Sequence, residues 1–362
     1  MSNSSGQVRA RRSAGPVVAV TGAAEGLGRA LVTRLVDNPA FGKIVAIDDH
    51  RGDASGVTWR VVDVRDPALA GRLAGVDVVV HLDLDISLDA DPTERRAYNV
   101  RGAQTVLTAA AAERVGRVVF VSTAMVYGAR PDNPVPLDED APVEAEPDAG
   151  LVGDFLEIEQ LAARAPAMHP GVEVTVLRPA ALVGPGVDTV ITRHFEAPRL
   201  LTAKGCPPRW QFCHVDDLVS ALELTAFGDV RGAVAVGCEG WLEQDAVEEI
   251  TGKRRFDLPA TVTFSTAQRL HRIGVTPAPA TDLHYVVYPW VVDTARLRSA
   301  GWRPAYDNAE ALEALIAETT GRHAALGRRL ARKEATLTAA GATVAVIGTA
   351  AIVRRARRKR RG

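Results

Sequence analysis

The sequence of 362 residues has few of the residues that mark several classes of protein. It holds only three cysteines, Cys206, Cys213 and Cys238, and no two of them have CxxC spacing. That number and spacing argue against a disulfide framework and against a zinc site, and they favour a reducing cytoplasm. No apolar run follows the first methionine. Residues 1–15 are polar and basic, so we expect a flexible basic tail there rather than a secretory signal.

Net charge is also small, at −1 for the whole chain, but its distribution is uneven. Residues 322–362 hold twelve Lys and Arg against one acid, Glu334, and residues 1–15 add three arginines. The body between these ends therefore carries a large net negative charge. An acidic body does not suit nucleic-acid binding, so we expect no nucleic-acid partner.

Short β-rich runs alternate with helical patterns over the first half of the chain. The runs are nearly continuous in apolar character, which is typical of strands buried on both faces. Strand–helix alternation implies βαβ units, so the predicted fold class is α/β, a Rossmann-type doubly wound parallel sheet. The predicted strands are Val17–Thr21, Lys43–Asp48, Thr58–Val62, Val76–Leu82, Arg117–Ser122 and Val172–Leu177.

A glycine-rich loop joins the first of these strands to a predicted helix. Gly22, Gly26 and Gly28 allow a tight turn and let the backbone approach a pyrophosphate closely. The start of the helix supplies free N–H groups and the positive end of the helix dipole. The pattern predicts a dinucleotide site, with Glu25 and Leu27 in the same loop; the alternative is an ordinary strand–helix turn.

Acidic residues end the next two predicted strands. Asp48 follows the loop at the spacing where an acid binds the adenosine ribose hydroxyls and repels a 2′-phosphate. NAD is therefore the expected cofactor, and nearby Arg51 is the argument for NADP. Asp63 and Val64, at the end of the third strand, are placed to flank the adenine ring; a plain turn role for Asp63 is the alternative.

The regular alternation of predicted strands and helices ends after the strand that finishes at Leu177, and we divide the chain there. Residues 16–177 are predicted to form an NAD-binding Rossmann domain. Residues 178–320 are predicted to form a smaller C-terminal substrate region that packs on the carboxyl edge of the sheet and returns some elements to it. Residues 321–362 are predicted to form a basic helical tail.

Within that tail, residues 335–353 carry no charge for nineteen positions, and RRARRKRR follows. This length is enough to span a bilayer as a helix, which would hold the protein at the inner face of the membrane. The alternatives are a helix docked on the body and a disordered basic arm attracted to anionic lipid or nucleic acid.

Seven segments occur in the order and at the separations found in one known family. They are TGAAEGLG (21–28), DVVVHL (77–82), NVRGAQTVLTAA (99–110), VVFVSTAMVYG (118–128), VTVLRPAALVGPG (174–186), FCHVDDLVSAL (212–222) and DTARLRSAGWRP (293–304). On these segments the chain resembles the extended short-chain dehydrogenase/reductase family, in particular its NAD-dependent epimerases and dehydratases of the UDP-glucose 4-epimerase type. The resemblance runs from about residue 16 to 320. It implies NAD as cofactor and a nucleotide-sugar substrate, and we expect a homodimer.

The resemblance also implies further cofactor contacts, from Leu82, Asp83 and Pro179. Asp83 stands where the family usually has a small residue, so it would put a carboxylate near the phosphates or ribose of the cofactor. The glycine spacing of the loop is nearer to that of the compact branch of the superfamily than to TGxxGxxG.

The catalytic residues that the resemblance implies are only partly present. The family uses an Asn, a Ser or Thr hydroxyl, a Tyr acid/base and a Lys that lowers the pKa of that Tyr. By motif match, Asn99 is the Asn and Thr123 is the hydroxyl residue, whereas Leu151 and Phe155 occupy the Tyr and Lys positions. Asp154 is the one ionisable residue between these two, and a helix-start aspartate more often serves the helix dipole.

The segment after residue 177 offers one candidate residue for binding the diphosphate of a substrate. In the family an arginine before the HVDD segment contacts the diphosphate; here Arg209 lies one place earlier and Trp210 occupies that place. Arg193 and Arg296 are alternatives, and no His, Cys and Asp cluster has metal spacing, so no metal is expected. Two function classes follow: an NAD-dependent epimerase, dehydratase or oxidoreductase with an unidentified acid/base, or a non-catalytic NAD-binding sensor or scaffold at the membrane.

Overall fold

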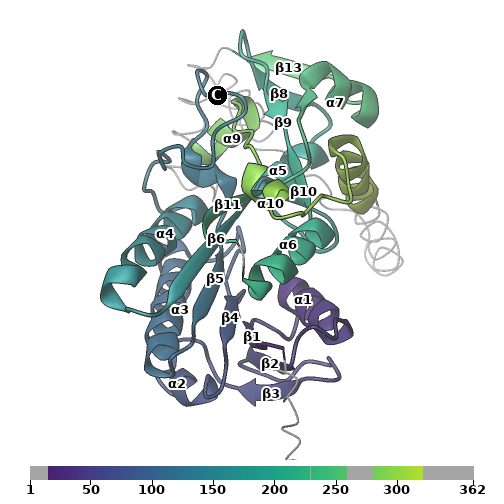
Figure 1. Ribbon diagram of the computed structural model, residues 1–362. Coiled ribbons are helices and arrows are strands. Elements are labelled where there is room, and N and C mark those ends of the chain that lie inside the picture. Colours follow the sequence, from purple (N-terminus) through teal and green to yellow (C-terminus); the bar gives the residue numbers. More distant parts are fainter. Residues whose placement is uncertain (1–14, 229, 259–279, 321–362) are drawn as a thin grey trace, which may run out of the picture.

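The computed structural model describes residues 15–228, 230–258 and 280–320 (Figure 1). Its centre is a seven-stranded sheet of order β11-β6-β5-β4-β1-β2-β3, in which every neighbouring pair is parallel. This confirms the predicted Rossmann-type doubly wound fold. The strands are β1 (Val17–Thr21), β2 (Lys43–Asp48), β3 (Thr58–Val61), β4 (Val78–His81), β5 (Arg117–Val121), β6 (Glu173–Pro179) and β11 (Gly232–Val236).

The strand order reverses beside β1. The chain runs outward from β1 through β2 to β3, and then returns to add β4 on the other side of β1. Loops that leave the carboxyl ends of β1 and β4 therefore diverge and open a crevice between them. Ligands of open α/β sheets bind at such a switch point, which is where the glycine-rich loop lies.

Helices cover both faces of the sheet (Figure 1). On one face, α1 (Gly26–Asp37) packs against α6 (Val215–Phe227); the other face carries α2 (Leu69–Arg72), α3 (Pro92–Ala112) and α4 (Leu151–Met168). The alternate side chains of each strand point to opposite faces, so the sheet contributes to two separate cores. Asp91 starts α3 by accepting hydrogen bonds from the N–H groups of Thr93 and Glu94, and Pro92 takes the first helical position.

The chain after residue 177 packs around a third core that includes Phe195, Trp210 and Phe212. Its strand β11 pairs with β6 and so completes the main sheet from beyond residue 177. The other elements are η1 (Ala124–Tyr127), β7 (Ala181–Val183), α5 (Val190–Glu196), β8 (Leu200–Ala203), β9 (Arg209–Trp210), β10 (Phe212–His214), β12 (Leu242–Glu243), α7 (Gln244–Thr251), β13 (Arg255–Leu258), η2 (Ala280–Leu283), α9 (His284–Val287), α10 (Ala295–Ser299) and a helix over 308–320.

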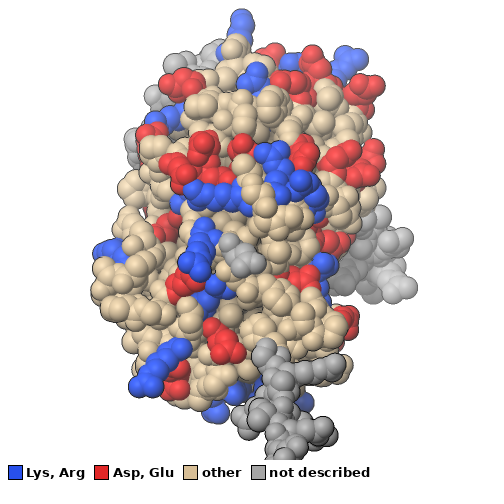
Figure 2. All heavy atoms as spheres, in the orientation of Figure 1, with Lys and Arg blue, Asp and Glu red and all other residues tan. Residues whose placement is uncertain are grey.

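Two of the predicted segments, the basic tail at the N-terminus and the tail 321–362 with its uncharged stretch, lie outside the described residues apart from Gly15. Within the described ranges no helix is long and apolar enough to cross a membrane. On the face shown in Figure 2, acidic and basic side chains lie next to one another rather than in separate fields. A continuous basic surface is what nucleic-acid-binding domains usually present.

Candidate functional site

A cavity of ≈ 500 Å³ opens at the carboxyl edge of the sheet, beside the switch point. The glycine-rich loop forms one wall, and Leu151 and Phe155 contribute to the opposite side of the same cavity. Nine of the predicted cofactor residues line it: Gly22, Glu25, Gly26, Leu27, Gly28, Asp48, Leu82, Asp83 and Pro179.

The loop needs its glycines for two different reasons. Gly22 and Gly26 have φ angles of +65° and +51°, which side-chain-bearing residues rarely adopt. Gly28 lies against the loop itself, because an added Cβ would be 1.9 Å from the Gly22 oxygen. At Gly26 the added Cβ would meet no atom within 4 Å, and Gly26 lines the cavity. The backbone at the start of α1 is therefore open to a ligand, and its first N–H groups are free of helix partners.

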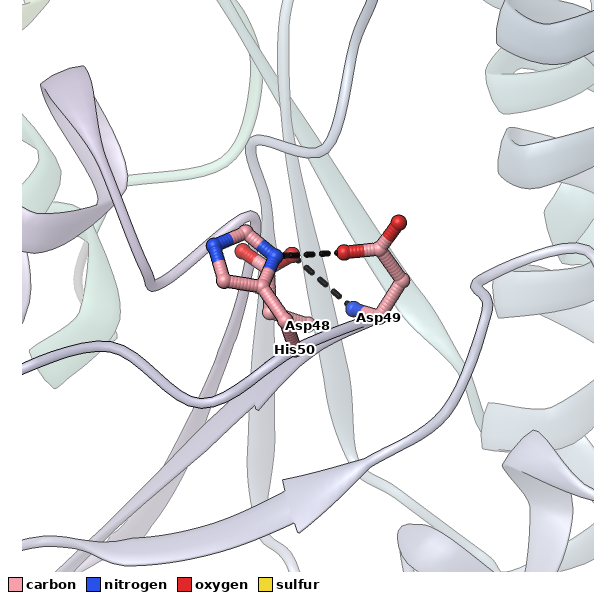
Figure 3. A group of neighbouring side chains, drawn as sticks. All are labelled: Asp48, Asp49 and His50. Atoms are coloured by element: carbon pink, nitrogen blue, oxygen red, sulfur yellow. Dashed lines mark hydrogen bonds and ion pairs between the residues drawn. The ribbon is translucent and has the colours of Figure 1, made fainter.

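Asp48 ends β2 and is held by the backbone around it. One carboxylate oxygen accepts from Ala24 N–H at 2.9 Å, and the other accepts from Asp49 N–H at 2.9 Å. The next side chain, His50, lies against Asp49 with 2.6 Å between its Nδ1 and the carboxylate (Figure 3). This contact raises the pKa of His50 and lowers that of Asp49. His50 lines the cavity beside Asp48, which the sequence analysis missed.

Asp48, Asp49 and His50 also lie close enough for their ligand atoms to fall within 4.8 Å of one another. However, Asp48 already accepts two backbone hydrogen bonds, and Asp49 is bonded to His50. The three side chains thus satisfy one another and the loop, and we assign no metal to them.

Asp83 replaces the small residue that the family usually has at this position. Its side chain lines the cavity and places a carboxyl group there. Tyr98 donates a hydrogen bond to this carboxylate at 2.6 Å. Burial raises the pKa of Asp83 to about 6, and the negative charges of Asp48 and Asp49 act in the same direction. Both effects favour the protonated form of this carboxyl group inside the cavity.

The positions matched to the catalytic residues of the family come together on one side of the cavity. Thr123 caps η1, where its hydroxyl accepts from Met125 N–H at 3.3 Å. Leu151 begins α4 and Phe155 follows one turn later, so the two share a face of the helix. All three line the cavity, and the surface at the Tyr and Lys positions is therefore apolar.

Asn99 and Asp154 lie behind that surface and do not line the cavity. Asn99, in the middle of α3, accepts from Asp85 N–H at 2.8 Å and donates to the Asp85 oxygen at 2.9 Å. It also donates to Asp154 at 3.1 Å, and Arg95 donates to the same carboxylate at 2.8 Å. Asn99 thus fixes the loop after β4 against α4, and Asp154 is a structural ion-pair partner rather than a proton acceptor for a ligand.

The pair Arg95–Asp154 allows a stability prediction, because both side chains are at most 5% exposed. Arg95→Met leaves a buried carboxylate without its cation, and we expect a loss of about 3–5 kcal/mol in the free energy of unfolding. Arg96 is the matched control: it pairs with Glu157 on the surface, and Arg96→Met should cost about 0–1 kcal/mol. Urea denaturation measures both. If both variants lost the same free energy of unfolding, the structural role given to the Arg95–Asp154 ion pair would be contradicted.

Two of the predicted adenine contacts lie elsewhere. Val64 is fully buried in the core beneath α2 and α3, and Asp63 forms an ion pair with Arg65 at 2.6 Å. Neither is among the residues that line the cavity. The contact predicted for them stays a prediction.

The substrate-side arginines are also engaged with other groups. Arg209 pairs with Glu243 at 3.1 Å and lies 5.9 Å from the centre of the Trp241 ring. Arg193 pairs with Asp188, and Arg296 pairs with Asp140. None of the three lines the cavity.

The residues that sequence reasoning missed come from loops far apart in the chain. They include Ile86 and Leu88 after β4, Met125 in η1, Ile191 in α5 and Asp282 in η2. Apart from Met125, which lies inside the VSTAMVYG motif, none of these positions belongs to a motif. No local pattern marks them, because only the tertiary fold makes them neighbours.

A parallel sheet whose switch point carries a glycine-rich loop, with an acid at the end of the next strand, defines a Rossmann-type dinucleotide-binding fold. The chain belongs to the NAD dependent epimerase/dehydratase family, whose sequence model matches residues 18–230. This confirms the family to which the seven motif segments pointed.

The chain is also similar in sequence to individual proteins. An uncharacterized protein of Mycobacterium tuberculosis, Rv0501, is 29% identical over 309 residues, which are 82% of each chain. A 4-hydroxy-2-methyl-3-oxo-4-farnesyl-3,4-dihydroquinoline-1-oxide ketoreductase of Stigmatella aurantiaca is 31% identical over 239 residues, 60% of this chain and 68% of that protein.

Solved structures share the fold. UDP-glucose 4-epimerase of Thermotoga maritima, with UDP-glucose, matches 85% of this chain and 99% of its own with a TM-score of 0.63 and 18% identity. UDP-glucose 4-epimerase of Thermus thermophilus, in complex with NAD, matches 84% of this chain and 99% of its own with a TM-score of 0.61 and 20% identity.

Proposed function

We propose that this chain binds NAD(H) across the carboxyl edge of its sheet. The observation that carries the proposal is that the glycine-rich loop, Asp48 and Asp83 line the same cavity. The open backbone at Gly26 suits the pyrophosphate, and the Asp48 carboxylate suits the ribose hydroxyls. The family assignment and the NAD complex of the Thermus thermophilus relative support it.

The reacting centre beside this cofactor would differ from that of a standard epimerase. Thr123 offers a hydroxyl that can hydrogen bond to a reacting oxygen. Leu151 and Phe155 provide neither a phenol nor an ammonium group, and an apolar surface would not support either charged form. The protein therefore lacks the tyrosine–lysine chemistry and acts either through another proton carrier or by binding alone.

The second possibility, a non-catalytic NAD-binding sensor or scaffold at the membrane, is favoured by this apolar surface. The membrane part of that hypothesis rests on residues 335–362, which lie outside the described ranges. The two functions differ in a measurable way: an enzyme converts its substrate to a product with NAD(H) as the hydride carrier, and a sensor binds NAD(H) without turnover.

The ligand beside the cofactor is also part of the proposal. The Thermotoga maritima relative holds UDP-glucose, so a nucleotide sugar is one candidate. The Stigmatella aurantiaca relative is by name a ketoreductase of a compound with a farnesyl chain, so an apolar ketone is the other. The apolar side chains around Thr123 favour the second candidate.

The cofactor assignment predicts a preference for NAD(H) over NADP(H) of at least ~10-fold, because the Asp48 carboxylate repels a 2′-phosphate. Quenching of tryptophan fluorescence measures both dissociation constants. Asp48→Asn keeps an oxygen that can accept from Ala24 N–H but removes the charge, so the preference should fall to ~3-fold or less.

Asp53 provides the control, because it is an exposed acid that pairs with Arg29 and does not line the cavity. Asp53→Asn should leave the preference unchanged. A wild-type protein that binds NADPH as tightly as NADH would contradict the role given to Asp48.

A further inference from the structure

Outside the cofactor loop, the lining of the cavity is mostly apolar, and we call this part the apolar half of the cavity. Its lining comes from the loop after β4, from η1, from the first turns of α4, from β7 and from α5. The apolar side chains are Leu84, Ile86, Leu88, Met125, Leu151, Val152, Phe155, Leu182, Val190 and Ile191.

Positive charge is scarce on this side. Among the described residues that line the cavity there is no lysine and no arginine, and the one basic group, His50, lies at the end of β2 beside Asp48. A buried diphosphate needs cationic or N–H partners to replace its water. The glycine-rich loop can supply such partners to the cofactor, but among the described residues no cationic side chain lines the apolar half to hold a second diphosphate.

Few polar groups interrupt the apolar lining, and among the described residues of this half Asp282 is the one that carries an ionisable side chain. It lies in η2 and is 9% exposed, and it borders both this cavity and a neighbouring one lined by Asp148. Burial and the charge of Asp148 raise the pKa of Asp282 to about 7, while Arg95 acts in the opposite direction. A carboxylate here would repel an anionic ligand, whereas a hydroxyl or carbonyl group could share a hydrogen bond with the carboxyl group.

We propose that this half of the cavity binds a neutral, largely apolar small molecule through its ten aliphatic and aromatic side chains, with Asp282 as the hydrogen-bond partner of one hydroxyl or carbonyl group. The ligand class excludes nucleotide sugars, whose diphosphate would meet apolar walls and a carboxyl group. The inference rests on the proposed function, because it places this ligand beside the bound NAD(H).

Calorimetry on the full-length protein, saturated with NADH, tests the ligand class with three probes. Naphthalene and 2-naphthol share one ring system and differ by one hydroxyl group, and UDP-glucose represents the nucleotide sugars. We expect 2-naphthol to bind ~10-fold more tightly than naphthalene, since a hydrogen bond to a charged group contributes that much or more. UDP-glucose should bind more weakly than either.

Variants locate the probes in the cavity. Ile86 is 43% exposed, so Ile86→Glu is compatible with folding, and its charge should weaken both aromatic probes at least ~10-fold. Met168→Glu is the control, because Met168 is 67% exposed at the end of α4 and does not line the cavity; its affinities should match the wild type. Asp282→Leu should lower the affinity for 2-naphthol to that for naphthalene. The affinity for naphthalene itself should stay within ~3-fold of the wild-type value.

The outcomes separate this inference from the proposed function. NADH titrated alone tests the cofactor site, and its failure to bind would reject the proposed function. If NADH binds but UDP-glucose binds more tightly than 2-naphthol, or if Ile86→Glu leaves both aromatic probes unaffected, the apolar ligand class is overturned and the cofactor site stands. Unchanged discrimination between the two aromatic probes in Asp282→Leu would overturn the role of Asp282.

Discussion

The purified protein, saturated with NAD, is expected to show no appreciable 4-epimerase turnover of UDP-glucose or UDP-galactose. Removal of hydride from a sugar carbon requires a group that takes the hydroxyl proton at the same time. Thr123 can hydrogen bond to that oxygen, but its hydroxyl is far too weak a base to accept the proton. General acid/base catalysis contributes roughly 10²–10⁴-fold, so the rate should fall short of that of a competent epimerase by at least this factor.

A coupled assay that detects interconversion of the two UDP-sugars measures this directly. The double change Leu151→Tyr and Phe155→Lys should leave NAD affinity within a few fold and should not create turnover if the apolar half of the cavity rejects the sugar nucleotide. Robust wild-type turnover that survives Thr123→Ala would contradict the site assignment. It would require another proton acceptor in the cavity. Asp83 and Asp282 are the candidates, because burial raises their pKa values to about 6 and about 7.

A second large effect is expected at Gly26, where Gly26→Leu should weaken NAD(H) binding at least ~100-fold. The added Cβ meets no protein atom within 4 Å, so the side chain enters the open space in front of the first turn of α1. The pyrophosphate of the cofactor is proposed to occupy that space. The left-handed backbone at Gly26 costs a side-chain-bearing residue about 1–2 kcal/mol, which leaves the fold intact.

Gly75→Leu is the matched control for that strain. Gly75 also has a positive φ, +73°, and open space around its Cβ position, but it lies between α2 and β4, away from the cavity. Both variants should lose similar thermal stability without ligand, and only Gly26→Leu should lose NADH fluorescence enhancement. Gly28 is less informative, because its added Cβ would collide with the Gly22 oxygen and disturb the loop itself. Retained NADH affinity in Gly26→Leu would place the cofactor elsewhere.

The strands, the glycine-rich loop and the apolar side chains at positions 151 and 155 follow from the sequence alone. Strands buried on both faces must be apolar throughout, so the runs that became β1 and β2 have the predicted bounds. The loop is a local structure that only glycine permits at Gly22 and Gly26. Side chains absent from a segment cannot be supplied by folding, so the apolar character of Leu151 and Phe155 was already decided.

The tertiary structure decided which of the polar residues face the cavity. Asp154 stands between two cavity residues on α4, yet the helical twist turns it toward Arg95 and away from any ligand. Arg209 has the right place in the sequence for a diphosphate, but β9 directs it to Glu243. Leu242 pairs with Trp210 across two short strands, although the two residues lie far apart in the sequence.

Asp282 and Ile86 show the same limit most clearly. Almost 200 residues separate them in the chain, neither belongs to a motif, and both line the apolar half of the cavity. Hydrophobic periodicity in a sequence indicates which face of a helix or strand is buried, because the pattern depends only on residues a few positions apart. Which loops meet over Thr123 depends on the packing of elements distant in the sequence, so the character of the ligand site emerged only when the chain had folded.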